Sequence, residues 1–181
     1  MVEDECGFLY PEIDDNVCIR CKKCTLVCAF QNINENNKPL KTYAAVSKNK
    51  EQAVKSASGG VFAAIAKDFL NKGGIVFGAA FNEKKEVLHK SINKIEELYL
   101  LQGSKYVQSK IGNTYKEVKD LLIDGNKVLF SGTPCQVAGL KSYLGKEYDG
   151  LLTVDIICHA SQVKKYSSRI FNLWRASTEV D

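Results

Sequence analysis

The chain has 181 residues, of which 45% are apolar and 25% are charged, close to the average for globular proteins. This length admits one ordinary domain, or a small module followed by a domain of about 120 residues. The net charge of +4 comes from scattered lysines rather than from a basic block. We therefore expect no nucleic-acid partner.

Cysteine usage indicates the compartment. Four of the seven cysteines fall within eleven residues, and an odd total does not suit a disulfide framework. Residues 1–10 are acidic and lack the apolar run of a secretory signal. No stretch approaches the roughly eighteen apolar residues of a membrane span. These features predict a reduced, cytoplasmic protein with no membrane span.

The cysteine run predicts an iron–sulfur site. Its spacing, C-x2-C-x2-C-x3-C, is that of bacterial ferredoxins, in which a tight loop of thiolates wraps a cubane cluster. Zinc sites instead use pairs of cysteines separated by a longer spacer, which this run lacks. We predict a 4Fe-4S cluster, and hence electron transfer, on Cys18, Cys21, Cys24 and Cys28.

The fourth ligand of this cluster is open. In two-cluster ferredoxins the fourth cysteine of each run binds the other cluster, and only one run is present here. Either Cys28 completes its own cluster or the ligand comes from elsewhere, with Cys6 the nearest upstream candidate. Ala29 also stands where proline usually follows the fourth cysteine. Cys18, Cys21 and Cys24 are therefore the firmer part of the prediction.

Two lysines, Lys22 and Lys23, flank the ligands. We interpret them as part of a solvated turn. The alternative is functional: nearby positive charge would raise the reduction potential of the cluster or dock an acidic electron-carrier protein.

A polar loop over residues 31–38 separates this ferredoxin-like segment, residues 1–38, from a domain over residues 39–181. Periodicity and turn residues predict the elements of that domain. In chain order they are a helix over 61–70, capped by Ser58 and stopped by Gly73; strands over 74–81 and 87–92; a short helix over 95–101; a helix from Asn113 or Thr114 to Gly125; a strand over 127–131; a helix from Pro134 to Leu144; and a strand over 151–158.

Strand, helix and strand at this spacing form a βαβ unit, so we predict an α/β fold: a mixed sheet with flanking helices, preceded by the small cysteine module. The last strand is apolar almost throughout, as expected when helices cover both faces of a sheet. His89 lies within a strand among lysines and is assigned no role.

One group of candidate binding residues follows the predicted strands 127–131 and 151–158. Ligands of open α/β sheets bind outside the carboxyl ends of the strands, and N–H groups at a helix start can hold a phosphate or a flavin oxygen. A thiol in a first helical turn also gains from the helix dipole. If the two strands are parallel and adjacent, both cysteines and the histidine face one crevice; the alternative is a buried strand cysteine beside an incidental histidine. The residues are Thr133, Pro134, Cys135, Gln136, Cys158 and His159.

Two further segments are candidates for binding a phosphate or a cofactor. Ser58, Gly59 and Gly60 resemble a phosphate-cradling helix start, although an ordinary capped helix needs the same residue types. Another segment offers a flexible, cationic loop suited to a phosphate or to the carboxylate-rich tail of a cofactor. It consists of Gly103, Ser104, Lys105 and Tyr106.

Taken in order, these motifs resemble the beta-subunit family of coenzyme F420 hydrogenases and dehydrogenases, over nearly the whole chain from Gly7 to His159. The cysteine run is joined in this resemblance by Gly7-Phe-Leu-Tyr-Pro11, Ser58-Gly-Gly-Val-Phe62, Gly74-Ile-Val-Phe-Gly78, Gly103-Ser-Lys-Tyr-Val-Gln108, Phe130-Ser-Gly-Thr-Pro-Cys-Gln136 and Val154-Asp-Ile-Ile-Cys-His159. The sequence looks closer to the bacterial branch that is associated with polysaccharide-synthesis loci.

The resemblance implies an iron–sulfur flavoprotein oxidoreductase that passes electrons between the cluster and an F420-like hydride carrier through FAD. It also implies an electron-carrier protein or a partner oxidoreductase subunit. A flavin suits the task because it accepts a hydride as two electrons and releases them singly. The three candidate segments would line the flavin and substrate pocket.

The sequence departs from the family pattern at several points. Family members of this branch usually carry an earlier cysteine run, and they usually have glycine and then Pro-Ser after the Cys-His pair, where this chain has Ala160-Ser161-Gln162. Family members also continue well beyond Asp181. We therefore expect a chain truncated at both ends. The alternative function is a non-catalytic electron-transfer module, or a remnant, that keeps the cluster but not the flavin site.

Overall fold

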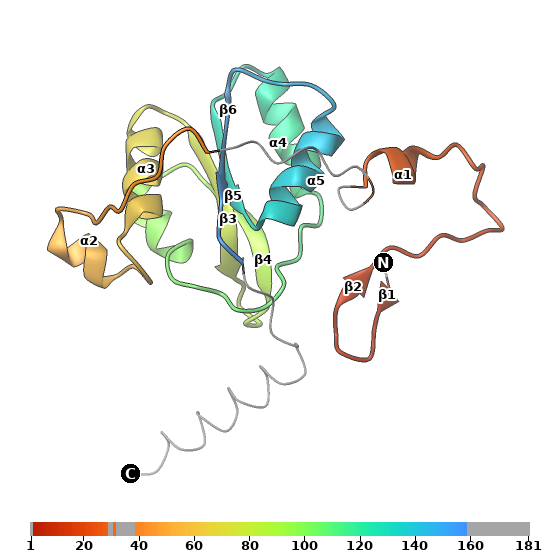
Figure 1. The fold of residues 1–181 in the computed structure, drawn as a ribbon, viewed down its shortest axis with the longest axis horizontal. Helices are drawn as coiled ribbons and strands as arrows, with labels where there is room; N and C mark the ends of the chain where they lie inside the picture. Colours follow the sequence, from red (N-terminus) through yellow and green to blue (C-terminus); the bar gives the residue numbers. More distant parts are fainter. Residues whose placement is uncertain (1, 29–30, 32–38, 159–181) are drawn as a thin grey trace, which may run out of the picture.

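The computed structural model describes residues 2–28, 31 and 39–158. At its centre lies a four-stranded sheet in the order β4-β3-β5-β6 (Figure 1). Strands β3, β5 and β6 are parallel, and β4 pairs antiparallel with β3. The predicted mixed α/β sheet is therefore confirmed. The strands are β3 (Ile75–Phe81), β4 (Val87–Ile92), β5 (Val128–Gly132) and β6 (Leu151–Asp155).

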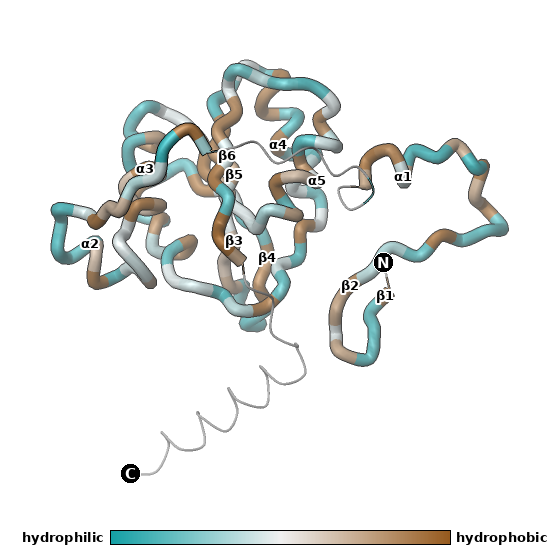
Figure 2. The backbone as a smooth tube through the Cα atoms, in the orientation of Figure 1, coloured by the Kyte–Doolittle hydropathy of each residue, from teal (hydrophilic) through white to brown (hydrophobic). Residues whose placement is uncertain are grey.

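Helices cover both faces of this sheet. Because side chains alternate along a strand, Val76 and Ala80 of β3 point to one face and Phe77 to the other. The first face packs against α3 (Val61–Asn71) and the 3-10 helix η1 (Ile95–Leu100). The second packs against α4 (Thr114–Ile123) and α5 (Pro134–Leu144). Figure 2 shows apolar backbone concentrated along the central strands, between the helical layers.

The helix starts follow the predicted signals with one exception. Asn113 is the N-cap of α4, and α5 begins at Pro134 as predicted. The prediction that Ser58 caps α3 is wrong, because the N-cap is Gly60, at φ 76°. That left-handed conformation suits glycine, and it starts the helix without a capping side chain. Gly73, at φ 75°, follows the end of α3 as predicted.

The last strand is shorter and more exposed than predicted. β6 ends at Asp155 rather than at residue 158. Strand pairing stops there because the partner strand β5 ends at Gly132, whose carbonyl oxygen accepts the last hydrogen bond, from Ile156 N–H. The chain after β5 then turns into α5 at Pro134. Among the described strands β6 lies at the edge, and the Leu152 side chain is 43% exposed. The apolar pattern therefore overstates the burial of this strand, although Val154 and Leu151 pack against the two core clusters.

Residues 2–28 form an open segment beside the sheet domain (Figure 1). It contains the antiparallel hairpin of β1 (Val2–Glu3) and β2 (Leu9–Tyr10), and the short helix α1 (Lys23–Leu26). A further short helix, α2 (Lys50–Val54), follows the gap and was not predicted. The predicted module boundary at residue 38 lies outside the described residues, so the division into two units stays a prediction. In the described ranges no helix is both long and apolar enough to cross a bilayer.

Two neighbouring residues of α4 test this packing. Leu122 is 7% exposed within the second core cluster, whereas Ile123 is 64% exposed. We expect Leu122→Ala to lower the free energy of unfolding by about 2–5 kcal/mol, because it leaves a cavity. Ile123→Ala, the matched control, should change it by less than about 1 kcal/mol. Urea denaturation of both variants measures the difference, and equal losses would contradict the assigned packing of α4.

Candidate functional site

The topology brings the candidate segments to one edge of the sheet. Because β3, β5 and β6 are parallel, their carboxyl ends meet at the same edge. α3 leads directly into β3, so its start at Gly60 lies at this edge, and α5 starts there because it follows β5 (Figure 1). Cys158 follows the end of β6. The strands that precede the two cysteines, β5 and β6, are parallel and adjacent, and both Cys135 and Cys158 are exposed. His159 lies outside the described residues.

A set of hydrogen bonds holds the turn at the end of β5. The Gln136 side-chain oxygen accepts a hydrogen bond of 3.1 Å from the N–H of Thr133, the N-cap of α5, which fixes the first turn of this helix. The Tyr115 hydroxyl donates a hydrogen bond of 2.8 Å to the backbone carbonyl oxygen of Gln136. The Cys135 thiol lies 3.1 Å from the Thr133 hydroxyl. Burial, followed by the electrostatic effect of Cys135, raises the pKa of Tyr115 to about 12, so this tyrosine remains a donor.

The same turn is connected to a buried histidine. His89 Nε2 lies 3.1 Å from the Ser131 carbonyl oxygen, and Nδ1 lies 3.0 Å from the Ser109 hydroxyl. Gln136 Nε2 donates to that hydroxyl at 2.8 Å. The His89 ring also stacks on Phe130, with ring centroids 5.1 Å apart. An unbroken series of polar contacts therefore runs from β4 to the start of α5.

These partners determine the tautomer of His89. A carbonyl oxygen only accepts, so Nε2 must carry the hydrogen and Nδ1 accepts from Ser109. A neutral imidazole satisfies both contacts. Burial lowers the pKa of His89, and the bond to the Ser131 carbonyl opposes that shift more weakly. The neutral ring therefore acts as a fixed connection between β4, β5 and the turn.

The sequence did not predict that His89, Ser109 and Tyr115 support this turn. A signal was available, because His89 is two residues after Val87 in a strand and so shares its inward face. The neighbouring lysines made the whole strand look solvent-exposed, so the inward position of His89 was not predicted. Ser109 and Tyr115 carried no signal, since their partners are distant in the sequence.

The glycine-rich segment is partly used by the chain itself. A Cβ at Gly59 would collide with the Ala45 carbonyl oxygen, and Ser47 N–H donates to the Gly59 carbonyl at 2.7 Å. The close backbone approach that these glycines allow was one reason for predicting a phosphate site here. In the structure, residues 45–47 of the chain itself occupy that position. The start of α3 keeps N–H groups without a capping side chain. Ser58 itself is exposed.

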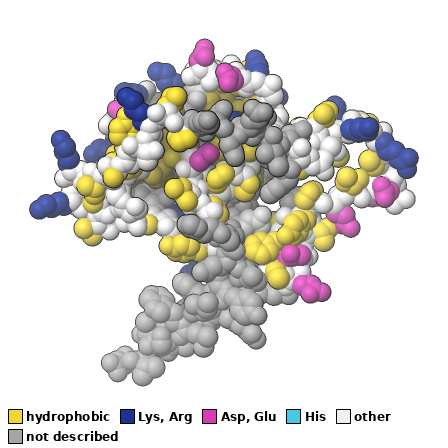
Figure 3. All heavy atoms as spheres, in the orientation of Figure 1, with side chains coloured by type: hydrophobic (Ala, Val, Ile, Leu, Met, Phe, Trp, Pro, Cys, Tyr) yellow, Lys and Arg dark blue, Asp and Glu magenta, His cyan; other side chains and the backbone are white. Residues whose placement is uncertain are grey.

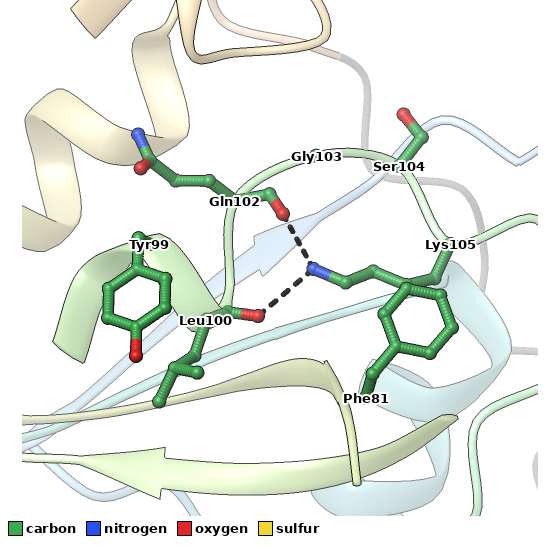
Figure 4. Close-up of a pocket in the computed structure, with 7 residues that line it drawn as sticks. All are labelled: Phe81, Tyr99, Leu100, Gln102, Gly103, Ser104 and Lys105. Atoms are coloured by element: carbon green, nitrogen blue, oxygen red, sulfur yellow. Dashed lines mark hydrogen bonds between the residues drawn. The ribbon is translucent and has the colours of Figure 1, made fainter. Parts of the chain in front are cut away.

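Lys105 of the predicted cationic loop lies half-buried beside a hollow. Its ammonium group donates to two carbonyl oxygens, of Gln102 at 2.7 Å and of Leu100 at 3.2 Å (Figure 4). Burial lowers its pKa to about 8. Gly103 and Ser104 line the same hollow. Tyr106 is not among the lining residues, and its side chain is 66% exposed.

Of the four cysteines of the run, Cys18 and Cys28 are half-buried, whereas Cys21 and Cys24 are exposed. Within residues 2–28, 31 and 39–158, no three His, Cys, Asp or Glu side chains are grouped so that they could hold a metal ion. The chain between the ligands is nevertheless strongly curved. Arg20 and Lys22 adopt left-handed conformations, at φ 54° and 58°.

The donor set fits a 4Fe-4S cluster in its chemistry and spacing. Gly7 is the only buried residue among residues 2–28, so this segment has no core of its own. A segment of this size without a core needs a metal or other cross-link to hold one conformation.

The fold has a counterpart among solved structures. A chain of the F420-reducing [NiFe] hydrogenase complex from Methanosarcina barkeri, in a xenon derivative, matches with a TM-score of 0.58 and 21% sequence identity. The match covers 76% of this chain and 52% of that chain, so this chain spans about half of its length. At this identity the likeness shows the fold alone. No protein-family model and no curated protein matches the sequence.

The buried histidine predicts a dependence of stability on pH. Because the folded state depresses the pKa of His89 below 6.5, its contribution is fully present above that pH and is lost as the pH falls. We expect the urea midpoint to fall between pH 7 and pH 5, and to fall less in His89→Gln. The chain has two histidines, so His159→Gln is the matched control. An unchanged slope in His89→Gln would contradict this assignment.

Proposed function

We propose that this chain is the electron-transferring subunit of an oxidoreductase. It would hold a 4Fe-4S cluster on Cys18, Cys21 and Cys24, completed by Cys28 or Cys6, and FAD at the carboxyl edge of the sheet. Its substrate would be a small hydride carrier. The observation that carries the proposal is the cysteine run, because spacing of this kind places thiolates around a cubane.

The fold supports the same reading. The neighbour of known structure belongs to a complex described as an F420-reducing [NiFe] hydrogenase, which is consistent with the family resemblance of the motifs. The sheet edge supplies what a flavin needs: two helix starts and an open hollow. A bound flavin would supply the exchange between two-electron hydride transfer and one-electron transfer to the cluster.

The residues at this edge have separable tasks. Uncapped N–H groups at the start of α3, after Gly60, would bind a phosphate of the cofactor. The turn from Thr133 to Gln136 would face the flavin ring, held in place by Tyr115 and by the connection to His89. Both supports come from other elements, so the turn is fixed before any ligand binds.

Basic side chains near the cysteine run support a protein partner. Arg20, Lys22 and Lys23 are all exposed and lie within four residues of one another. Figure 3 shows basic side chains at the outer end of this segment, around α1. An acidic electron carrier or partner subunit would dock there by charge attraction, which weakens as salt increases.

A second candidate is an electron-transfer module without flavin. Two observations favour it: Ala45 occupies the close approach at Gly59, and carbonyl oxygens occupy two donors of Lys105. A cofactor phosphate would have to share these positions. The two candidates differ in flavin binding and agree on the cluster.

Anaerobic reconstitution with iron and sulfide, followed by absorbance spectroscopy and iron quantification, tests the cluster. We expect about four irons per chain and loss of the cluster in Cys21→Ser, because a hydroxyl is a poor iron ligand. Cys135→Ser makes the same change outside the run and should keep the iron. Comparison of Cys28→Ser with Cys6→Ser identifies the fourth ligand, and zinc in place of iron would overturn both candidates.

Flavin quantification in the same samples separates the candidates. Bound FAD with sustained reduction of a deazaflavin or viologen dye supports the oxidoreductase. A full cluster without flavin binding supports the module that transfers electrons only.

A further inference from the structure

One face of β6 carries an apolar stripe that the described residues leave partly open. Side chains alternate along a strand, so Leu152 and Val154 point to the same face. Ile156 continues the alternation, because its N–H still bonds to the Gly132 carbonyl oxygen. Val154 packs against the core formed by α3 and η1, which identifies the face. On either side of it Leu152 is 43% exposed and Ile156 is 49% exposed.

The opposite face of β6 is already covered. Leu151 packs against the core formed by α4 and α5, and α5 is the helix that joins β5 to β6. In Figure 1, α4 and α5 lie on one side of the sheet and α3 lies on the other. A further element that packs on β6 must therefore use the side of α3, where the stripe is.

The sequence that follows β6 has a matching apolar pattern. Residues 159–181, which lie outside the described part of the chain, come directly after Cys158. From residue 163, apolar side chains recur at the first, fourth, eighth, eleventh and twelfth positions, a spacing typical of one face of a helix. They are Val163, Tyr166, Ile170, Leu173 and Trp174. The positions that a helix would place opposite are polar, namely Lys164, Lys165, Ser168, Arg169, Asn172 and Arg175. Neither glycine nor proline interrupts residues 163–175.

Lengths and connections suit such a helix. Residues 163–175 would span about 20 Å at the helical rise of about 1.5 Å per residue. The five residues of β6 span about 17 Å at about 3.3 Å per residue. Residues 157–162 would connect the two, within the usual strand-to-helix range of about 2–6 residues. Because this connection begins at the carboxyl end of β6, a helix that packs on the strand runs back towards its start.

We propose that residues 163–175 form an amphipathic helix that packs on this stripe and covers the open side of β6. Its direction places Val163 and Tyr166 near Ile156, and Trp174 near Leu152 at the start of the strand. The basic face of the helix stays in water. The segment is tethered next to the stripe, and this high effective concentration favours it over a separate molecule. Docking needs neither cluster nor FAD, so this proposal and the proposed function fail separately.

Trp174 is the only tryptophan of the chain, so intrinsic fluorescence reports on this segment alone. In the full-length chain we expect its emission to be blue-shifted from that of free N-acetyltryptophanamide. Leu152→Asp should raise the acrylamide quenching constant at least about threefold, because burying a carboxylate in an apolar contact is costly and the helix is released. Ile123→Asp makes a similar change at an exposed position of α4 and should leave quenching unchanged. Equal quenching in the two variants overturns the proposal.

Further outcomes identify a different occupant or none. A blue shift that grows with protein concentration, together with a dimer in analytical ultracentrifugation, assigns the stripe to a second copy and overturns the proposal. A blue shift that appears only with vesicles of phosphatidylserine and phosphatidylcholine assigns the segment to a membrane surface and overturns it as well. If circular dichroism shows that Leu152→Asp fails to fold, Leu152→Ala replaces it, and unchanged quenching in that variant counts against the proposal.

Discussion

Burial of β5 on both faces is the constraint on which the rest of the structure depends. Every residue of this strand is buried, and it pairs with β3 on one side and β6 on the other. Leu129 joins the core formed by α3 and η1, whereas Val128 and Phe130 join the core formed by α4 and α5. Since the strand is held from four directions, the position where it ends is held as well. Pro134 then turns the chain into α5 at that position.

The edge that results combines rigid and exposed parts. In the turn after β5, the Gln136 backbone carbonyl is tied to Tyr115 of α4, and the Gln136 side chain is tied to Ser109 and through it to His89 of β4. The Cys135 thiol remains exposed on this fixed support. A buried polar network of this kind is stable only when each member has a partner, and the neutral His89 ring meets that condition.

The cysteine segment is organised by a different principle. Almost none of its side chains are buried, so the hydrophobic effect that holds the sheet domain cannot hold it. Its order would come from ligand bonds to a metal centre. The sheet domain has the opposite character, because its two cores are complete without any ligand. If a cluster forms, it would therefore add order to residues 2–28 and leave the sheet largely unchanged.

The sequence by itself determined most of the sheet domain. Its strands and helices have periodicities and start signals that act locally, as Pro134 at the start of α5 illustrates. The parallel pairing of β5 and β6 was expressed only as a condition, because strand order depends on contacts between distant residues. The true cap of α3 depended on a left-handed glycine rather than on a serine. The end of β6 depended on where its partner stopped.

Only the tertiary structure decided the environment of individual side chains. His89 reads as a surface residue among lysines, yet packing against Phe130 and Ser131 buries it and lowers its pKa. Lys105 was expected as a cation free to bind a phosphate, and the carbonyl oxygens at the end of η1 take two of its donors. Both outcomes depend on burial, a property of the assembled fold. The cysteine spacing, in contrast, is local, and so the sequence alone carries the prediction of the cluster.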